Sequence, residues 1–571
     1  MLKIPYGLCD FERIRTKNFL YVDKTRFIEM VESIDYVLHL RPRRFGKSLF
    51  IDTLDYYYDL ESENKFDELF KGLYIHENQT PYRHKYYILR LDFSGIQNTA
   101  SENLEQGFLR RVTIDAEIFI NRYKLDIQLG DANSASGVLD SLLKGFRALE
   151  LEHKIYIMID EYDHFTNSLL TGDGVEFLSV LQRGGFVRSF YEVIKRNAGR
   201  GPVERIFMTG VMSVTLDSMT SGFNIATNIT TIKDFSDMMG FTTTEVQELL
   251  KLSYTNSRKV GEIVQLTNDE QVQIYDIFRE NYNGYLFSED SSSKVFNSTL
   301  IIYYLQHYLP HRVPPRSLVD ANLNQSGATI ESIVGLKNQE QNYKIIEEII
   351  NEKKVGGTLQ HFFEIDKRFD RNDLITLLFN IGFLTIKESG FTIKFEAPNR
   401  IIKNIYMQFL GEMVQRRHNY KLDTSKQECA VEQVGEQGRI DALTALVSDF
   451  LMHTSNRNTL KFDEKYIKLI YKILLSSTEQ FIVYDEFPSL QGYGDLVILK
   501  APNSFAKYEL LIELKYIKKS DTTDAEIEKE LGSGTSQIEK YMKDERLATR
   551  DALKKFVVVF SGFEPVRLLE L

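Results

Sequence analysis

The N-terminal half of the chain is organised around residues 36–48, which read YVLHLRPRRFGKS. The first five residues are an apolar run that predicts a short buried strand, and a helix is expected to begin near Ser48. A loop that ends in Gly46-Lys47-Ser48 between a strand and a helix is typical of a P-loop, which binds phosphates with backbone N–H groups, the helix N-terminus and the lysine. The pattern differs from G-x-x-x-x-G-K-[ST] at its first position, where Arg41 replaces glycine.

A second apolar run strengthens this interpretation. Residues 155–159, IYIMI, lead directly into Asp160 and Glu161. This is a Walker B arrangement, in which the aspartate holds the water shell of Mg²⁺ and the glutamate polarises the attacking water. The alternative is a buried strand that ends in solvated acids. The expected ATP-binding residues are Arg43, Arg44, Gly46, Lys47, Ser48, Asp160 and the sensor candidate Thr209, with Ser48 and Asp160 near Mg²⁺ and Glu161 in the catalytic role.

The first 250 residues alternate between apolar runs and helical stretches. Strands are expected at residues 36–40, 86–93, 155–159 and 205–210. Strands separated by helices predict a mostly parallel sheet with helices on both faces, and therefore an α/β fold.

The pattern changes twice further along the chain, so three domains are expected, at residues 1–250, 251–410 and 411–571. The middle region is mainly helical and ends in a helix at 371–381 and a hairpin at 383–395, an order that resembles a small winged-helix module. The last region is expected to be α/β. A helix at 462–475 precedes strands at 481–484, 495–499 and 510–514; a Gly/Ser break is expected at 532–536, and a last strand at 556–560.

Acidic and basic residues in the last region have the spacing of a metal-dependent nuclease. Gly494-Asp495 begins one expected strand, and Glu513-Leu514-Lys515 lies on the next. Adjacent strands would place Asp495 beside Glu513, where carboxylate oxygens can hold Mg²⁺. Glu513 and Lys515 are two residues apart, so both side chains point to one face and the lysine can orient water or stabilise phosphorane charge.

Alternation of Glu and Lys on an exposed strand is common, so the tripeptide alone is a weak signal. Gln537 and Tyr541 strengthen it, because they lie four residues apart on one helical face, where they can contact a nucleotide or brace the lysine. Glu464 and Glu486 are candidate supplementary ligands, although each is more readily explained as a solvated surface acid.

Several of these strings resemble known families. Residues 21–25 (YVDKT), 41–49 (RPRRFGKSL), 160–163 (DEYD) and 281–285 (NYNGY) are similar to motifs of the AAA-ATPase-like family, which lies near the STAND-type NTPases. In that family RPRRFGKS is the usual P-loop, so Arg41 is not expected to impair phosphate binding. Residues 462–571 resemble the PD-(D/E)xK restriction-endonuclease-like domain that is often fused to such ATPases. The resemblance implies ATP and Mg²⁺ as cofactors.

Composition narrows the expected surface charge and location of the protein. The 571 residues carry a net charge of −11, which argues against a generally basic surface but permits a local basic groove. The two cysteines, Cys9 and Cys429, form no disulfide framework, so a reducing, cytoplasmic location is expected. No signal peptide is expected, since Met1 leads into Lys3 and Pro5 without an apolar segment, and no membrane span is expected, since the longest apolar run, residues 374–386, is too short to cross a bilayer.

These observations favour an ATP-binding, ATP-hydrolysing protein with a Mg²⁺-dependent nuclease domain that cleaves phosphodiester bonds. Nucleic acid is the expected partner, DNA rather than RNA, and a homo-oligomer is left open. The alternative is a signalling or binding NTPase whose nuclease-like domain grips nucleic acid without cleaving it.

Overall fold

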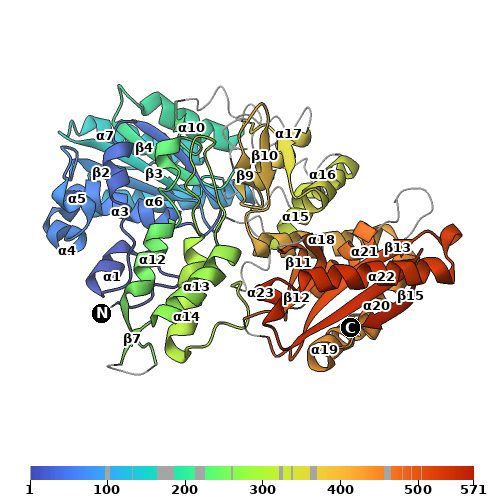
Figure 1. Ribbon diagram of the computed structural model, residues 1–571. Coiled ribbons are helices and arrows are strands. Elements are labelled where there is room, and N and C mark those ends of the chain that lie inside the picture. The colour runs from blue at the N-terminus through green and yellow to red at the C-terminus, as the bar shows by residue number, and fades with distance from the viewer. Residues whose placement is uncertain are drawn as a thin grey trace. The chain divides into compact units, whose positions relative to one another are not determined.

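The computed structural model describes residues 2–96, 103–130, 133–163, 185–212, 225–258, 262–320, 326–335, 338–360, 369–454, 464–476, 478, 480–489, 492–502 and 504–571. The chain forms two compact units (Figure 1). The first contains Met1–Arg312 and Val319–Ile402, and the second contains Val313–Leu318 and Lys403–Leu571. The three-domain division at residues 250 and 410 stays a prediction.

The first unit is built on a five-stranded sheet in the order β2-β3-β4-β1-β5, in which every neighbouring pair is parallel. Its strands are β1 (Tyr36–Leu40), β2 (Tyr86–Asp92), β3 (Lys154–Asp160), β4 (Val203–Gly210) and β5 (Thr227–Asn228). The predicted parallel sheet is confirmed. The edge strand β5 was not predicted, because its two residues are exposed and carry no apolar pattern.

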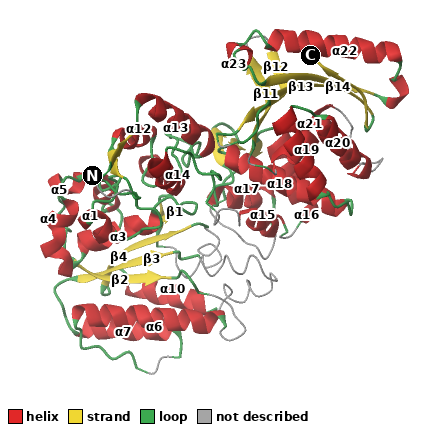
Figure 2. Ribbon diagram, turned by 90° about the horizontal axis from the view of Figure 1, so that it is seen from below, coloured by secondary structure: helices red, strands yellow, loops and turns green. Residues whose placement is uncertain are grey.

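Helices cover both faces of this sheet (Figure 2). On one side lies α3 (Lys47–Tyr58), and on the other lie α6 (Leu104–Tyr123), α7 (Ala135–Ala148) and α10 (Phe186–Asn197). In α7 the buried residues Val138, Leu142 and Phe146 recur at helical spacing, so a single apolar stripe packs inward. Shorter elements flank the sheet: α1 (Phe11–Thr16), α2 (Arg26–Val31), η1 (Leu60–Lys65), α4 (Phe66–Phe70), α5 (Tyr74–Glu77) and η2 (Lys233–Phe235).

The rest of the first unit is mainly helical, as expected. Its helices are α12 (Thr243–Lys251), α13 (Asn268–Asn281), α14 (Ser298–His311), α15 (Ser326–Val334), α16 (Gln339–Asn351) and α17 (Arg371–Asn380). Its strands are β6 (Ser253–Thr255), β7 (Ile263–Gln265), β8 (Val355–Gly357), β9 (Thr385–Glu388) and β10 (Ile393–Glu396). The predicted helix and hairpin are α17 with β9 and β10, and β8 extends the hairpin to a three-stranded antiparallel sheet. The likeness to a winged helix stays a prediction.

The second unit contains a mixed sheet in the order β11-β12-β13-β14-β15, with β13 and β14 parallel and the other pairs antiparallel. Its strands are β11 (Phe481–Ser489), β12 (Gly492–Lys500), β13 (Glu509–Ile517), β14 (Leu553–Ser561) and β15 (Glu564–Glu570). Its helices are α18 (Arg400–Arg417), which begins at the end of the first unit, α19 (Thr424–Gln437), α20 (Asp441–Thr454), α21 (Glu464–Ser476), η4 (Lys519–Asp521), α22 (Asp524–Tyr541) and α23 (Glu545–Ala548). In Figure 2, α22 covers one face of the sheet and α19, α20 and α21 lie on the other.

Two sequence predictions for the second unit were wrong. The strand at 556–560 is not the last, because β15 follows it with mostly exposed residues whose polar and apolar types do not alternate, so they give no strand signal. The break at 532–536 is absent, since α22 runs through it. Gly534 allows α22 to pack closely there: a Cβ at this position would lie 2.5 Å from Val557 Cγ1. Within the described ranges, no helix is long and apolar enough to cross a membrane.

Candidate functional site

The P-loop begins where β1 ends and leads directly into α3. Arg44 and Gly46 have positive φ angles of 72° and 96°, so the backbone turns sharply before the first turn of the helix. Lys47 opens α3, and its Nζ donates to the carbonyls of Arg41 and Pro42, each at 3.0 Å. Burial lowers the pKa of Lys47, and the charges of Asp160 and nearby acids oppose that shift. The lysine thus lies along its own loop.

Arg41, the residue that replaces glycine, braces the loop from below. Its guanidinium is almost completely buried and donates to the carbonyls of Leu40, Thr230, Phe235 and Ser236, at 2.8 to 3.4 Å. It also lies over the Phe287 ring, 4.2 Å from the centroid. Burial lowers its pKa to about 9. These contacts give Arg41 a structural role, because its guanidinium ties the loop to backbone carbonyls at Thr230, Phe235 and Ser236.

The acids of β3 meet the P-loop at the carboxyl edge of the sheet. Asp160 is buried, which raises its pKa, while a hydrogen bond from the Ser48 side chain opposes the shift. Ser48 and Asp160 therefore lie together, as a shared metal site would require. Glu161 is half-buried and lines the same cavity as Lys47.

Thr209 lies at the end of β4, the strand between β1 and β3. Its side chain is fully buried, and its hydroxyl donates to the carbonyl of His39 at 2.8 Å. Among the described residues it does not line the cavity that contains Lys47. The structure therefore directs the Thr209 hydroxyl to β1 and not to this cavity.

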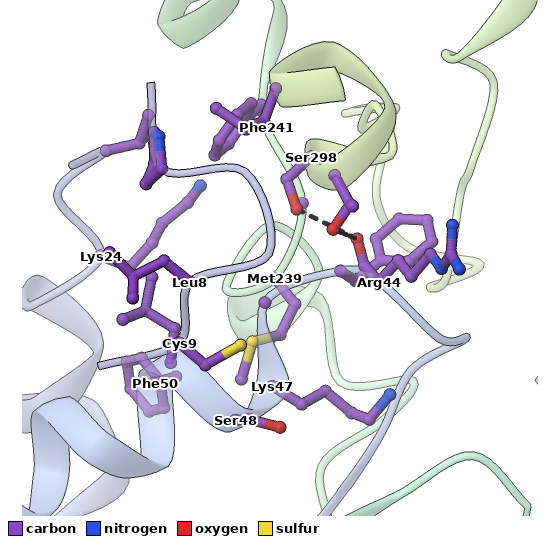
Figure 3. A pocket seen from close by; sticks show the side chains of 18 of the residues that line it. Leu8, Cys9, Lys24, Arg44, Lys47, Ser48, Phe50, Met239, Phe241 and Ser298 are labelled. Atoms are coloured by element: carbon purple, nitrogen blue, oxygen red, sulfur yellow. Dashed lines mark hydrogen bonds between the residues drawn. The ribbon is translucent and has the colours of Figure 1, made fainter. Parts of the chain in front are cut away.

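A cavity of about 520 Å³ opens above the P-loop, a size within the usual range for small-molecule sites (Figure 3). Arg43, Gly46, Lys47 and Ser48 form its polar floor. The walls are largely apolar and come from three segments: Leu8, Leu20 and Phe50 near the N-terminus and α3, Met239 and Phe241, and Ile302 of α14. The polar floor suits the phosphates of a nucleotide, and the apolar walls suit its base.

Contacts from distant segments clamp the P-loop in place. The Arg44 carbonyl accepts from the hydroxyls of Ser298 and Thr299, at 3.2 and 2.9 Å (Figure 3). The Arg44 guanidinium pairs with Asp320 at 2.7 Å. Sequence reasoning missed all three partners. Ser298 and Thr299 open α14, and neither carries a pattern that marks it as the partner of a distant loop.

Residues 21–25, YVDKT, attach the N-terminal segment to the other side of the cavity. Lys24 is buried, and its Nζ donates to Glu245 at 2.7 Å and to the Asp237 carbonyl at 2.9 Å. Asp23 accepts from the Thr25 backbone N–H at 2.8 Å. These contacts tie the N-terminal segment to residues 237–245, which form the opposite wall.

The second candidate site lies on β12 and β13. Leu496 is opposite Ile512 in the antiparallel register, and one position further along lie Asp495 and Glu513. Asp495 Oδ2 accepts from the Leu514 backbone N–H at 3.0 Å. Both carboxylates are buried. The expected neighbours on adjacent strands are therefore brought together, next to the point where the pairing of β12 with β13 stops.

Each of these carboxylates faces a lysine. Lys515 Nζ donates to Glu513 Oε1 at 2.8 Å, and Lys468 Nζ of α21 donates to Asp495 Oδ1 at 2.5 Å. Burial and the charge of Asp495 raise the pKa of Glu513 to about 7. Burial alone would lower the pKa of Lys515, but the hydrogen bond and charge of Glu513 raise it. Sequence reasoning missed Lys468, because a lysine on an amphipathic helix carries no distinguishing pattern.

Helix α22 closes the same site. Gln537 is half-buried, and its Oε1 is buried without a hydrogen-bond partner among the described residues. Burial raises the pKa of Tyr541, and the charges of Glu513, Asp495 and Glu464 raise it further, so the phenol faces the carboxylates. Gly534 lets the helix approach, since a Cβ there would lie 3.5 Å from Glu513 Cγ.

The oxygen atoms of this site determine whether a divalent metal ion fits it. Glu513 Oε2 is buried and lacks a partner among the described residues, so one hard oxygen is available for a cation. Within the same part of the chain, no three His, Cys, Asp or Glu side chains cluster closely enough to hold a metal. The Glu486 side chain lies outside the described residues. The site thus fits a metal ion held by two carboxylates, with other positions left to water or phosphate.

Comparison with known families assigns a class to one range near each end of the chain. A family model described as a predicted AAA-ATPase matches residues 5–220, and one described as the PD-(D/E)XK nuclease superfamily matches residues 462–568. The chain therefore joins an AAA-ATPase-like domain to a domain of the PD-(D/E)XK nuclease superfamily, as the sequence motifs predicted.

Individual relatives are more distant. An uncharacterized protein in the vnfD 5′ region of Azotobacter chroococcum mcd 1 is 26% identical over 318 residues, which cover 54% of this chain and 53% of that protein. The chain thus spans about half the length of this curated relative. The crystal structure of Cdc6p from Pyrobaculum aerophilum aligns over 66% of this chain and 88% of that one, at 12% identity and a TM-score of 0.23, which is too low to establish a shared fold.

Proposed function

We propose that the first unit binds and hydrolyses ATP and that the second unit cleaves phosphodiester bonds of nucleic acid with a divalent metal ion. The observation that carries the proposal is the meeting of Asp495, Glu513 and Lys515 on adjacent strands, within the range that matches a nuclease superfamily. Binding alone does not require two buried carboxylates beside a lysine, because carboxylates repel phosphate.

In the first unit, the P-loop backbone and the N-terminus of α3 would receive the phosphates. Lys47 has only to turn from the loop carbonyls towards the cavity to reach them, and Ser48 with Asp160 would hold Mg²⁺. Glu161 lines the cavity and is placed to orient the attacking water. Thr209 would act through the position of β1 rather than by touching nucleotide, since its hydroxyl is bonded to His39.

In the second unit, Asp495 and Glu513 would hold the divalent ion, which when bound activates water and neutralises the scissile phosphate. Lys515 lies beside Glu513 and supplies a fixed positive charge for the phosphorane. Gln537 and Tyr541 present an amide and a phenol from α22, both suited to contacting a nucleotide. DNA is proposed as the substrate ahead of RNA.

One observation favours a second function. Lys468 forms an ion pair with Asp495, so one carboxylate is already neutralised by the protein. If that pair persisted in the working protein, the second unit would grip nucleic acid without cleaving it, and the ATPase would act as a switch.

Cleavage assays distinguish the two functions. The full chain is incubated with linear DNA, circular DNA and RNA, with and without Mg²⁺ and ATP, beside Asp495→Asn and the exposed control Asp521→Asn. If the second unit is a nuclease, cleavage should require Mg²⁺, be lost in Asp495→Asn and be retained in Asp521→Asn. Binding without cleavage of any substrate would support the second function.

A further inference from the structure

Lys468 contacts the carboxylate site of the second unit but has no role in the proposed cleavage reaction. It lies on α21, one helical turn after Glu464, and reaches Asp495, whereas Lys515 of β13 reaches Glu513. The side chains of Lys468 and Asp495 are only 13% and 12% exposed, so this is an enclosed ion pair and not a surface pair. Enclosed pairs are screened much less than exposed ones.

The two oxygens of Asp495 are both engaged by protein donors. Oδ2 accepts from the Leu514 backbone N–H, and Oδ1 accepts from Lys468 Nζ. Glu513 differs, because Lys515 engages Oε1 while Oε2 is buried without a partner among the described residues. A metal ion between the two carboxylates could therefore bind Oε2 of Glu513, whereas the Lys468 ammonium occupies Oδ1 of Asp495.

An ammonium ion and a divalent ion cannot share that oxygen closely. Mg²⁺ binds carboxylate oxygen at about 2.0–2.1 Å, and Lys468 Nζ already lies 2.5 Å from Oδ1. The two positive charges would repel strongly in an enclosed site. The lysine must move aside for the metal to bind, and its long flexible side chain allows this.

We propose that Lys468 holds the metal position of Asp495, competes with the divalent ion for Oδ1, and turns to a phosphate of the nucleic acid once the ion displaces it. This inference rests on the proposed function in taking Asp495 and Glu513 as the metal ligands and nucleic acid as the substrate. Lys468 is a positioning residue that acts through Asp495. It makes metal binding weak in the free protein and favourable when a phosphate is present to receive the ammonium, which is a positive coupling between the two ligands.

The test measures Mn²⁺ affinity of the nucleotide-free full chain by calorimetry. Lys468→Met removes the charge but keeps a chain of similar length, so Mn²⁺ should bind at least about tenfold more tightly. Lys465→Met removes the same charge from an exposed position on the same helix and should leave the affinity unchanged. Lys468→Arg retains the charge and should stay close to wild type, and Lys468→Gln should repeat the Met result if the Met variant fails to fold.

The outcomes separate this inference from the proposed function. Glu513→Gln should remove Mn²⁺ binding in the second unit. If neither wild type nor Lys468→Met binds Mn²⁺, or if Glu513→Gln binds it as wild type does, the metal site itself is refuted. If Glu513→Gln loses binding while Lys468→Met and Lys468→Gln bind Mn²⁺ no more tightly than wild type, the metal site stands and the competition by Lys468 is refuted.

Discussion

The raised pKa of Glu513 gives metal binding a specific dependence on pH. A divalent ion needs the carboxylate in its charged form, whereas burial and the neighbouring Asp495 favour the protonated form. With a pKa of about 7, protons compete with the metal below neutral pH. Metal affinity in the second unit should therefore rise as the pH rises towards neutral and level off above it.

The magnitude follows from the ionised fraction. At one pH unit below the pKa only about a tenth of Glu513 is charged, so the apparent affinity should be about tenfold weaker than its plateau, or about 1.4 kcal/mol. An unperturbed glutamate would be fully ionised in this range and would produce no such change. The slope therefore reports the buried environment of this one side chain.

Calorimetric titration of the nucleotide-free chain with Mn²⁺ between pH 5.5 and 8.5, on the order of half-unit steps, measures this dependence. Asp160→Asn serves as the control, because it removes the buried acid of the P-loop unit, whose pKa is also raised. The slope should persist in Asp160→Asn and disappear with the binding itself in Glu513→Gln. A flat profile across neutral pH in wild type, or a slope that vanishes in Asp160→Asn, would refute the assignment.

Four further predictions follow from the two sites. Lys47→Ala should weaken ATP binding at least tenfold, about 1.4 kcal/mol, by calorimetry; unchanged affinity would rule out the P-loop. Glu161→Gln should retain ATP binding while turnover falls about a hundredfold, and undiminished hydrolysis would make Glu161 a surface acid. Arg41→Met should destabilise the first unit by on the order of 3 kcal/mol, because buried carbonyls lose their donor; thermal unfolding measures this, and an unaltered midpoint contradicts it. Glu513 has a folded-state pKa above its unfolded value, so its charge destabilises the metal-free fold as pH rises from about 4.5 to about 7; Glu513→Gln should therefore be more stable than wild type at pH 8, by up to about 3 kcal/mol in chemical unfolding, and equal stability would contradict this.

The sequence was most informative where apolar runs adjoin polar residues. The strand before Arg41 and the strand before Asp160 are long, buried and bounded by turn or acid residues, so local pattern was sufficient. The spacing of Asp495 and Glu513 likewise predicted neighbours on adjacent strands, and the register brings them together. In these cases the information lies within one or two consecutive elements.

The remaining features depend on contacts between distant segments. Arg41 is bonded to the Thr230 carbonyl nearly two hundred residues away, and no local pattern records a backbone acceptor. Lys468 resembles any lysine of an amphipathic helix until α21 is packed against the sheet. The position of Thr209 at the end of a strand predicted a sensor residue. Whether its hydroxyl faces a nucleotide or the His39 carbonyl depends on the packing of β4 against β1, which the sequence does not record.

The most direct test of the central claim compares wild type with Glu513→Gln in one preparation of each, measuring Mg²⁺-dependent cleavage of DNA and affinity for ATP. The substitution removes a proposed metal ligand but keeps the shape of the side chain, and the proposed ATP site belongs to the other unit. We predict that Glu513→Gln loses cleavage completely and binds ATP as wild type does. A wild-type protein that cleaves no nucleic acid with Mg²⁺ or Mn²⁺, or a Glu513→Gln variant that cleaves as fast as wild type, would contradict the account.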